Sequence, residues 1–126
     1  MKEILTQISS DGTTSFLMGD HNMPSHYDSS IEWPVSKLLE DAGFADCYRM
    51  LNPEQSGVTW PYRKEQMDSF DKYLEDRVDF IYARSGDVKV KILDAFVFEK
   101  ELGKWPSDHK AVIVKAELSQ AQMRGI

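Results

Sequence analysis

The sequence has one cysteine, no long apolar run and no excess of positive charge. Cys47 cannot form an internal disulfide and has no CxxC partner, which excludes a disulfide scaffold and a zinc ribbon. We expect it to be a buried small hydrophobe. No segment approaches the roughly 20 apolar residues that a membrane-spanning helix needs. With 15 Lys and Arg against 21 Asp and Glu, the net charge of −6 argues against tight, sequence-independent binding to nucleic acid.

What is present is the composition of one soluble globular domain. The chain has 126 residues, of which 41% are hydrophobic and 29% charged, enough for one packed core and hardly for two. The N-terminal segment MKEILTQISS lacks the apolar centre of a signal peptide, so a cytoplasmic location is the default expectation.

The spacing of apolar residues predicts two helices near the start of the chain. A short one has Ile4, Leu5 and Ile8 on one face. A second one begins at Pro34, which suits a first helical turn, and ends before Gly43, which stands at the C-cap position.

The rest of the chain is mostly β by composition and alternation. The predicted strands are 16–18, 57–60, 77–83, 88–92, 95–98 and 111–118, with loops at 21–30, 63–75 and 103–108. We expect 16–18 to be a buried strand, 77–83, 88–92 and 95–98 to belong to one sheet, and 111–118 to close the chain with another strand. Helices and strands in this order predict a mixed α/β domain of the α+β kind, with helices on one face of the sheet.

A first polar cluster, Gly19-Asp20-His21-Asn22, follows the strand 16–18. Asp20 and Asn22 are two positions apart and point the same way, so together they could hold a hard cation and a phosphoryl oxygen. The alternative is an Asx-turn that caps the loop, and for this motif taken alone it is the more frequent outcome.

A second polar residue, Asp79, lies inside an otherwise apolar strand, on the same face as Ile81 and opposite Val78, Phe80 and Tyr82. Burying this carboxylate without a partner would be costly. A histidine is one natural donor, because a carboxylate fixes the imidazole tautomer and raises its basicity. A salt bridge to a Lys or Arg is equally compatible with the sequence.

The third cluster, Ser107-Asp108-His109, precedes the last strand. Three consecutive residues cannot place a nucleophile, a base and an orienting acid in line, which excludes a catalytic triad. In extended backbone Asp108 and His109 point to opposite sides, so one could face a metal while the other reaches Asp79. A polar loop without function is the alternative for this trio alone.

Taken in order, the three clusters resemble the motifs of the endonuclease/exonuclease/phosphatase superfamily, the deoxyribonuclease I-like phosphoesterases. Residues 19–22 resemble its GDxN motif, residues 77–80 its R-hydrophobic-D-aromatic motif, and residues 107–109 its SDH motif. Local features similar to the bacterial branch extend the resemblance over nearly the whole chain, at 24–26, 33–36, 43–44, 48–49, 57–60 and 105–106.

The resemblance implies hydrolysis of a phosphoester by in-line attack of water, assisted by Mg²⁺ or Mn²⁺. Asp20 would orient or activate the water near the metal, and Asn22 would hold a phosphate oxygen. Asp108 would help to bind the metal, directly or through water. His109, oriented by Asp79, would contact the phosphate and stabilise its developing charge. His21 stands where the family usually has an aromatic or apolar residue, and we expect it to be structural.

The resemblance also implies a fold, half of a four-layer α/β sandwich with a mostly antiparallel mixed sheet. The family's domain consists of two similar halves packed sheet against sheet, and all three motifs belong to the C-terminal half. Residues 1–126 would then be a single domain equivalent to that half, a fragment that could be inactive alone. A signal peptide could have been lost with the other half, so the location stays open.

Two expectations about partners follow. The sheet face that would pack on the other half should be an exposed apolar surface, so the chain should associate with itself or with a partner. The substrate would be a phosphodiester, a phosphomonoester or a lipid headgroup, which the acidic charge favours slightly over duplex nucleic acid. The alternative function is a non-catalytic assembly module that retains the sheet scaffold.

Overall fold

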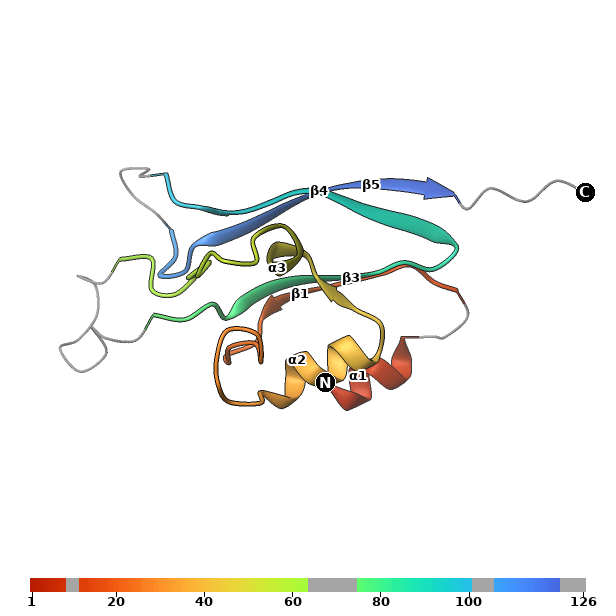
Figure 1. Ribbon diagram of the computed structural model, residues 1–126, viewed down its shortest axis with the longest axis horizontal. Coiled ribbons are helices and arrows are strands. Elements are labelled where there is room, and N and C mark those ends of the chain that lie inside the picture. Colours follow the sequence, from red (N-terminus) through yellow and green to blue (C-terminus); the bar gives the residue numbers. More distant parts are fainter. Residues whose placement is uncertain (9–11, 64–74, 101–105, 121–126) are drawn as a thin grey trace, which may run out of the picture.

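The computed structural model of the protein describes residues 1–8, 12–63, 75–100 and 106–120 (Figure 1). The helices and strands are, in chain order, α1 (Lys2–Gln7), β1 (Ser15–Asp20), α2 (Pro34–Asp41), β2 (Ala45–Asp46), α3 (Cys47–Leu51), β3 (Asp79–Arg84), β4 (Val88–Phe98) and β5 (Ala111–Gln120). Most of the predicted loop at 63–75 and part of the one at 103–108 lie outside the described residues.

The strands form two sheets, and their arrangement gives an α+β fold. One sheet has the order β1-β3-β2 and the other is the hairpin β4-β5, and the strand pairs in both are antiparallel. In Figure 1 the helices α1 and α2 lie on one side of the three-stranded sheet, while α3 and the hairpin lie on the other. The expectation of one sheet for residues 77–83, 88–92 and 95–98 is wrong, because alternation shows which face of a strand is buried and not which strand pairs with it.

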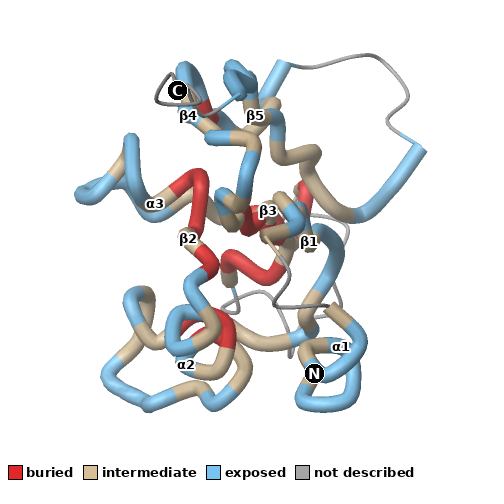
Figure 2. Tube along the Cα trace, turned by 90° about the vertical axis from the view of Figure 1, so that its right-hand side faces the viewer, coloured by how far each residue is buried: buried red, intermediate tan, exposed pale blue. Residues whose placement is uncertain are grey.

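The main core lies between the three-stranded sheet and the helices. Its buried members are Leu39 from α2, Phe44 just after α2, and Phe80 and Tyr82 from β3. Figure 2 shows the buried backbone concentrated around β2, β3 and α3 in the middle of the molecule. The alternation predicted for the strand around Asp79 is confirmed, because Phe80 and Tyr82 face this core.

Helix α2 begins and ends as its sequence predicts. Pro34 occupies the first turn, and Gly43 has φ +85° just after the helix. The Gly43 amide donates to the Glu40 carbonyl, and the Phe44 amide donates to the Leu39 carbonyl at 2.9 Å each. This is a Schellman motif, in which the glycine adopts the left-handed conformation and the last helical carbonyls find partners.

Two predicted strands differ from the structure. The segment 16–18 does form β1, but it is not buried: 63% of Met18 and 39% of Phe16 are exposed, because only one face of this strand is covered by the helices. The segment 57–60 is not a strand, and only Trp60 forms an isolated bridge, with Asp76.

Other elements are longer or shorter than the periodicity suggested. The segments predicted at 88–92 and 95–98 are one strand, β4, with a register shift between Ile92 and Asp94. The short elements β2 and α3 were not predicted; α3 is capped by Asp46, whose side chain accepts from the Arg49 amide. Cys47 is fully buried, as expected, and burial raises its pKa to about 11. Among the described helices none is both long and apolar enough to cross a membrane.

Candidate functional site

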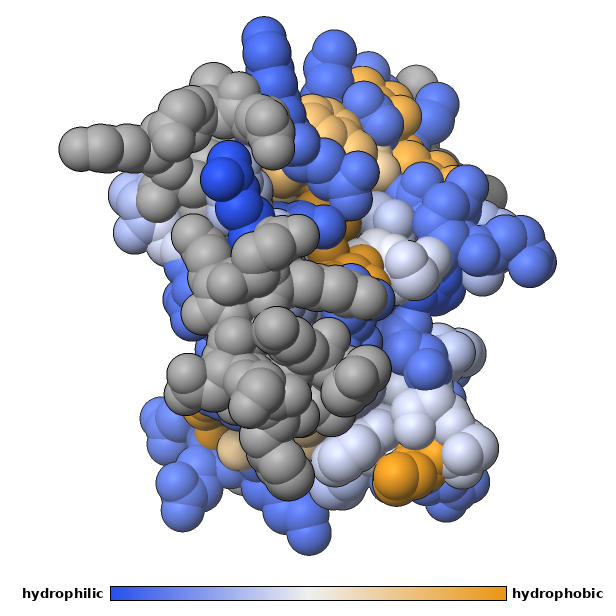
Figure 3. All heavy atoms as spheres, turned by 90° about the vertical axis from the view of Figure 1, so that its left-hand side faces the viewer, coloured by the Kyte–Doolittle hydropathy of each residue, from blue (hydrophilic) through white to orange (hydrophobic). Residues whose placement is uncertain are grey.

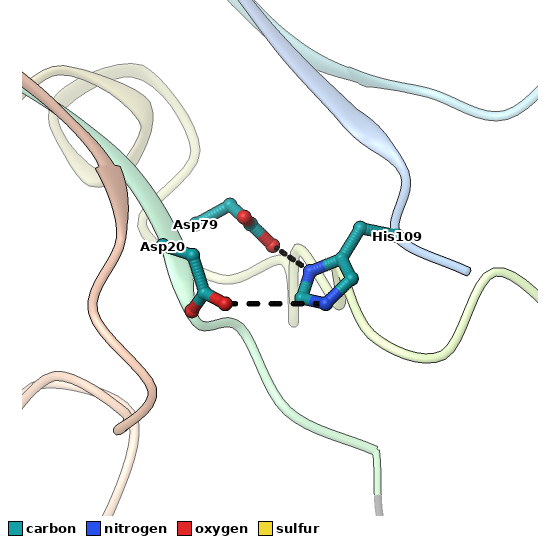
Figure 4. Close-up of side chains that lie close together, drawn as sticks. All are labelled: Asp20, Asp79 and His109. Atoms are coloured by element: carbon teal, nitrogen blue, oxygen red, sulfur yellow. Dashed lines mark hydrogen bonds and ion pairs between the residues drawn. The ribbon is translucent and has the colours of Figure 1, made fainter. Parts of the chain in front are cut away.

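Three of the predicted site residues meet at one end of the sheet, as Figure 4 shows. Asp20 ends β1 and Asp79 begins β3, and the two are register partners. His109 comes from the segment that leads into β5. Its Nδ1 lies 2.8 Å from Oδ2 of Asp79, and its Nε2 lies 4.0 Å from Oδ2 of Asp20. One ligand atom from each residue lies within 4.8 Å of the others.

Within the part of the chain that the structure describes, the side-chain partner of Asp79 is therefore the histidine. An ionised carboxylate has no proton to give, so it accepts from Nδ1–H, and this leaves Nε2 directed towards Asp20. Burial by itself would lower the pKa of His109. The hydrogen bond and charge of Asp79, aided by the charges of Asp108 and Asp20, outweigh that effect and raise the pKa above 6.5.

Asp108 lies on the solvent side of the same imidazole. Its side chain is 74% exposed, and Oδ1 is 4.0 Å from Nε2 of His109. Its other oxygen, Oδ2, accepts from Nε1–H of Trp60 at 3.4 Å. The two residues expected to bind a metal, Asp20 and Asp108, thus both lie 4.0 Å from one nitrogen, although Asp108 is outside the tighter group.

Asn22 forms the Asx-turn that its motif left open as one alternative. Its backbone amide donates to Oδ1 of Asp20 at 2.7 Å and its φ is +53°, so the Asx-turn is present. The turn occupies only Oδ1 of Asp20, while Oδ2 faces His109. Asn22 also lines a cavity of about 320 Å³ together with Trp60, Asp76, Val78 and His109.

The neighbouring polar residues of these motifs have structural contacts. The His21 ring stacks on Tyr82 with a centroid distance of 5.8 Å and lies 5.0 Å from Phe80. Burial lowers its pKa, and the nearby carboxylates only partly oppose this. The hydroxyl of Ser107 accepts from the His109 backbone amide at 3.0 Å, a local turn that agrees with the exclusion of a catalytic triad.

Sequence reasoning missed the role of Arg77, which lies two residues before Asp79. Its guanidinium is 1% exposed and donates to both carboxylate oxygens of Asp46, at 2.9 and 2.6 Å. It also donates to Asp28, in the loop that follows Asn22, at 2.9 Å. The signal was available in the motif, because an Arg next to a buried strand needs acidic partners. Arg77 thereby connects the segment that carries Asp79 to the loop that follows Asp20 and Asn22.

The donor atoms fit a hard divalent cation. Asp20 and Asp108 offer carboxylate oxygens that are partly or mostly exposed, and Mg²⁺ is typically bound by one or two carboxylates while it keeps several waters. Nδ1 of His109 is engaged by Asp79, so it is not available as a ligand. The arrangement can therefore place a cation, a water molecule and a charged imidazole around one anionic group.

A solved structure provides the fold family. The endonuclease/exonuclease/phosphatase family protein from Leptotrichia buccalis C-1013-b superposes with a TM-score of 0.61 over 92% of this chain, at 21% sequence identity. This chain has the endonuclease/exonuclease/phosphatase fold. The resemblance inferred from the three motifs is confirmed at the level of fold, and so is the α+β class.

A further comparison is with a protein of undetermined role. The uncharacterized protein F14F9.5 from Caenorhabditis elegans is 30% identical over an alignment of 121 residues, which covers 77% of this chain. No protein-family model matches the sequence. The chain spans 38% of the length of the nematode protein and 41% of the Leptotrichia chain. That it is equivalent to the C-terminal half of such a domain stays a prediction.

Proposed function

We propose that this protein is a metal-dependent phosphoesterase, or the part of one that carries the Asp79–His109 pair. The observation that supports this most is the 2.8 Å contact between these two side chains, with Asp20 4.0 Å beyond the imidazole. A histidine that is held by one carboxylate, lies 4.0 Å from a second and lines an open cavity suits phosphoryl chemistry better than a structural role.

Each residue has a separate task in the proposed mechanism. Asp20 orients the attacking water and accepts its proton on Oδ2, the oxygen that the Asx-turn leaves available. As the new bond from the water oxygen to phosphorus forms, the bond from phosphorus to the leaving oxygen breaks, and the leaving alkoxide takes up a proton from solvent. His109 donates Nε2–H to a phosphate oxygen, and Asp79 stabilises the imidazolium. Asn22, at the wall of the cavity, holds a second phosphate oxygen.

Asp20 and Asp108 would hold the divalent cation, Mg²⁺ or Mn²⁺. When bound, the cation would neutralise charge on the phosphate and lower the pKa of a bound water. The raised pKa of His109 keeps the imidazole protonated over more of the neutral range, as a donor to an anionic oxygen requires.

The substrate is proposed to be a phosphoester small enough for a cavity of about 320 Å³. The net charge of −6 favours a small phosphodiester, a phosphomonoester or a lipid headgroup over duplex nucleic acid. Binding of nucleic acid would require positive charge from chain regions beyond this sequence or from a partner.

The test is hydrolysis of a chromogenic phosphodiester and a chromogenic phosphomonoester with Mg²⁺, Mn²⁺ or EDTA. Asp20→Asn should lower turnover by roughly 100-fold or more, and EDTA should abolish it. Asp41→Asn is the matched control, because Asp41 ends α2 on the exposed surface away from the site. Turnover that persists in Asp20→Asn, or that EDTA does not affect, would contradict the proposal.

A specific observation keeps the assembly function as the second candidate. Phe16 and Met18 occupy alternate positions of β1 before Asp20 and are 39% and 63% exposed. The hairpin exposes further apolar side chains at Leu93 and Phe96. In the view of Figure 3, apolar residues reach the surface in the upper part and again near the bottom. Such surface is typical of an interface.

A measurement of self-association distinguishes the assembly function from the phosphoesterase function. An assembly module should form a concentration-dependent oligomer by light scattering, and this oligomer should persist in Asp20→Asn and be lost in Met18→Glu. A chain that stays monomeric at high concentration would exclude self-assembly through this face.

A further inference from the structure

Thr59 is a fully buried polar residue to which both halves of the candidate site are hydrogen-bonded. It is 0% exposed. Its hydroxyl oxygen accepts from the backbone amides of Val78 at 3.0 Å and Asp79 at 3.2 Å. Its carbonyl oxygen accepts from the amide of Lys110, the residue after His109, at 2.7 Å.

This position matters because Asp79 and His109 belong to different sheets. Asp79 begins β3 of the three-stranded sheet, whereas His109 leads into β5 of the hairpin, and β3 is not a ladder partner of β5. The 2.8 Å contact between the two side chains therefore depends on how the two sheets are aligned. A shift of about 1 Å would break a hydrogen bond of this length.

The hydrogen bonds of Thr59 align the two sheets at Asp79 and next to His109. The hydroxyl fixes the amide of Asp79 itself, and the carbonyl fixes the residue next to His109. The same short segment adds the Tyr62 amide, which donates to the Asp108 carbonyl at 2.6 Å. A threonine suits the position, since its hydroxyl oxygen can accept two bonds while its methyl group remains in the apolar interior.

We propose that Thr59 is a positioning residue, which holds the Asp79 carboxylate at hydrogen-bonding distance from His109 and thereby fixes the imidazole with its proton on Nδ1. The role of Thr59 in catalysis rests on the proposed function, but its effect on which nitrogen of His109 carries the proton does not. The readout below is the protonation site of His109 and not turnover, so loss of activity and loss of positioning are measured separately.

The experiment compares Thr59→Val, Thr59→Ser and Thr14→Val by ¹⁵N NMR of His109, at a pH above its titration. Thr59→Val keeps the shape and removes the acceptor, so the single Nδ1–H tautomer should be lost and Nε2–H should appear beside it. Thr59→Ser keeps the oxygen and should retain the wild-type spectrum. Thr14 is the control, because its hydroxyl also forms two hydrogen bonds to a distant part of the chain. It accepts from the Gly86 amide and donates to the Val88 carbonyl, at the turn between β3 and β4.

Three outcomes would overturn the proposal. They are a folded Thr59→Val protein that keeps the single tautomer, a Thr59→Ser protein that loses it, and a Thr14→Val protein that changes His109 as much as Thr59→Val does. If Thr59→Val does not fold, amide exchange in the wild type provides the test. The Val78 and Asp79 amides should exchange roughly tenfold or more slowly than an exposed amide, and fast exchange at both would overturn the role of the hydroxyl.

Discussion

Asp20 and Asp79 lie directly opposite each other at the ends of β1 and β3, and His109 contacts both from the segment before β5. Like charges that face each other across two strands repel and destabilise the sheet. The imidazolium of His109 offsets this repulsion because it lies close to both carboxylates. The histidine thus stabilises the pair of acids, and this coupling underlies the first prediction.

Asp79→Asn should lower the pKa of His109, measured by NMR titration. The pKa of His109 is raised in the folded protein, so its charged form adds stability that is fully present below pH 6.5 and is lost as the pH rises through the raised value. The difference in unfolding free energy between wild type and Asp79→Asn should accordingly shrink as the pH rises through that range.

The control for this pH dependence is Asp108→Asn. Asp108 is 74% exposed and acts on His109 only by charge at 4.0 Å, so its removal should lower the pKa of His109 less than Asp79→Asn does. An equal effect of both variants would mean that the hydrogen bond to Asp79 is not the main reason for the raised pKa.

Arg77→Met should destabilise the fold by about 3–5 kcal/mol, because it leaves the buried carboxylate of Asp46 without its cation, whereas Asp28 keeps its ion pair with Arg49. Urea unfolding measures this loss. Lys37→Met is the matched control, since Lys37 and Glu40 form an exposed pair at 3.9 Å, and such pairs contribute about 0–1 kcal/mol. Similar losses in the two variants would contradict the structural role of Arg77.

Gly43→Ala should destabilise the protein by about 1–2 kcal/mol, the cost of a left-handed conformation for a residue with a Cβ. Steric contact adds little, because the new Cβ would lie 3.6 Å from Cδ of Arg84, an ordinary contact. Gly43→Asn should cost less, since Asn tolerates this conformation better. Thermal unfolding of both variants measures the difference, and equal losses would argue against backbone strain as the cause.

Mg²⁺ should bind weakly to this chain. Asp20 and Asp108 are the carboxylates proposed to hold a cation, their side chains are 35% and 74% exposed, and each lies 4.0 Å from a histidine nitrogen. A site of this kind leaves most of the coordination to water. Calorimetry should therefore give a low affinity that Asp20→Asn reduces further. Tight, stoichiometric binding to the wild type would contradict this.

Much of the local structure could be predicted because its causes are local. Pro34 and Gly43 set the ends of α2 through φ angles that their own covalent structure favours. Alternation placed Phe80 and Tyr82 on the core side of β3 and Asp79 on the other. The predictions were wrong where packing against distant parts of the chain determines the structure. The exposure of Met18 depends on what covers β1, and the pairing of β4 depends on where β5 lies.

The sequence by itself determined the residue types of the candidate site and their order along the chain. Asp20, Asp79 and His109 are identifiable from their motifs, because a motif consists of residue types and their spacing, which can be read without knowing the fold. The family resemblance implied that Asp79 orients His109, but the residues by themselves left a Lys or Arg partner equally possible. The tertiary structure decided for His109 among the described residues, because that contact joins two sheets that share no ladder. Thr59 and Arg77 became visible for the same reason: their effect consists of bonds to residues distant in sequence.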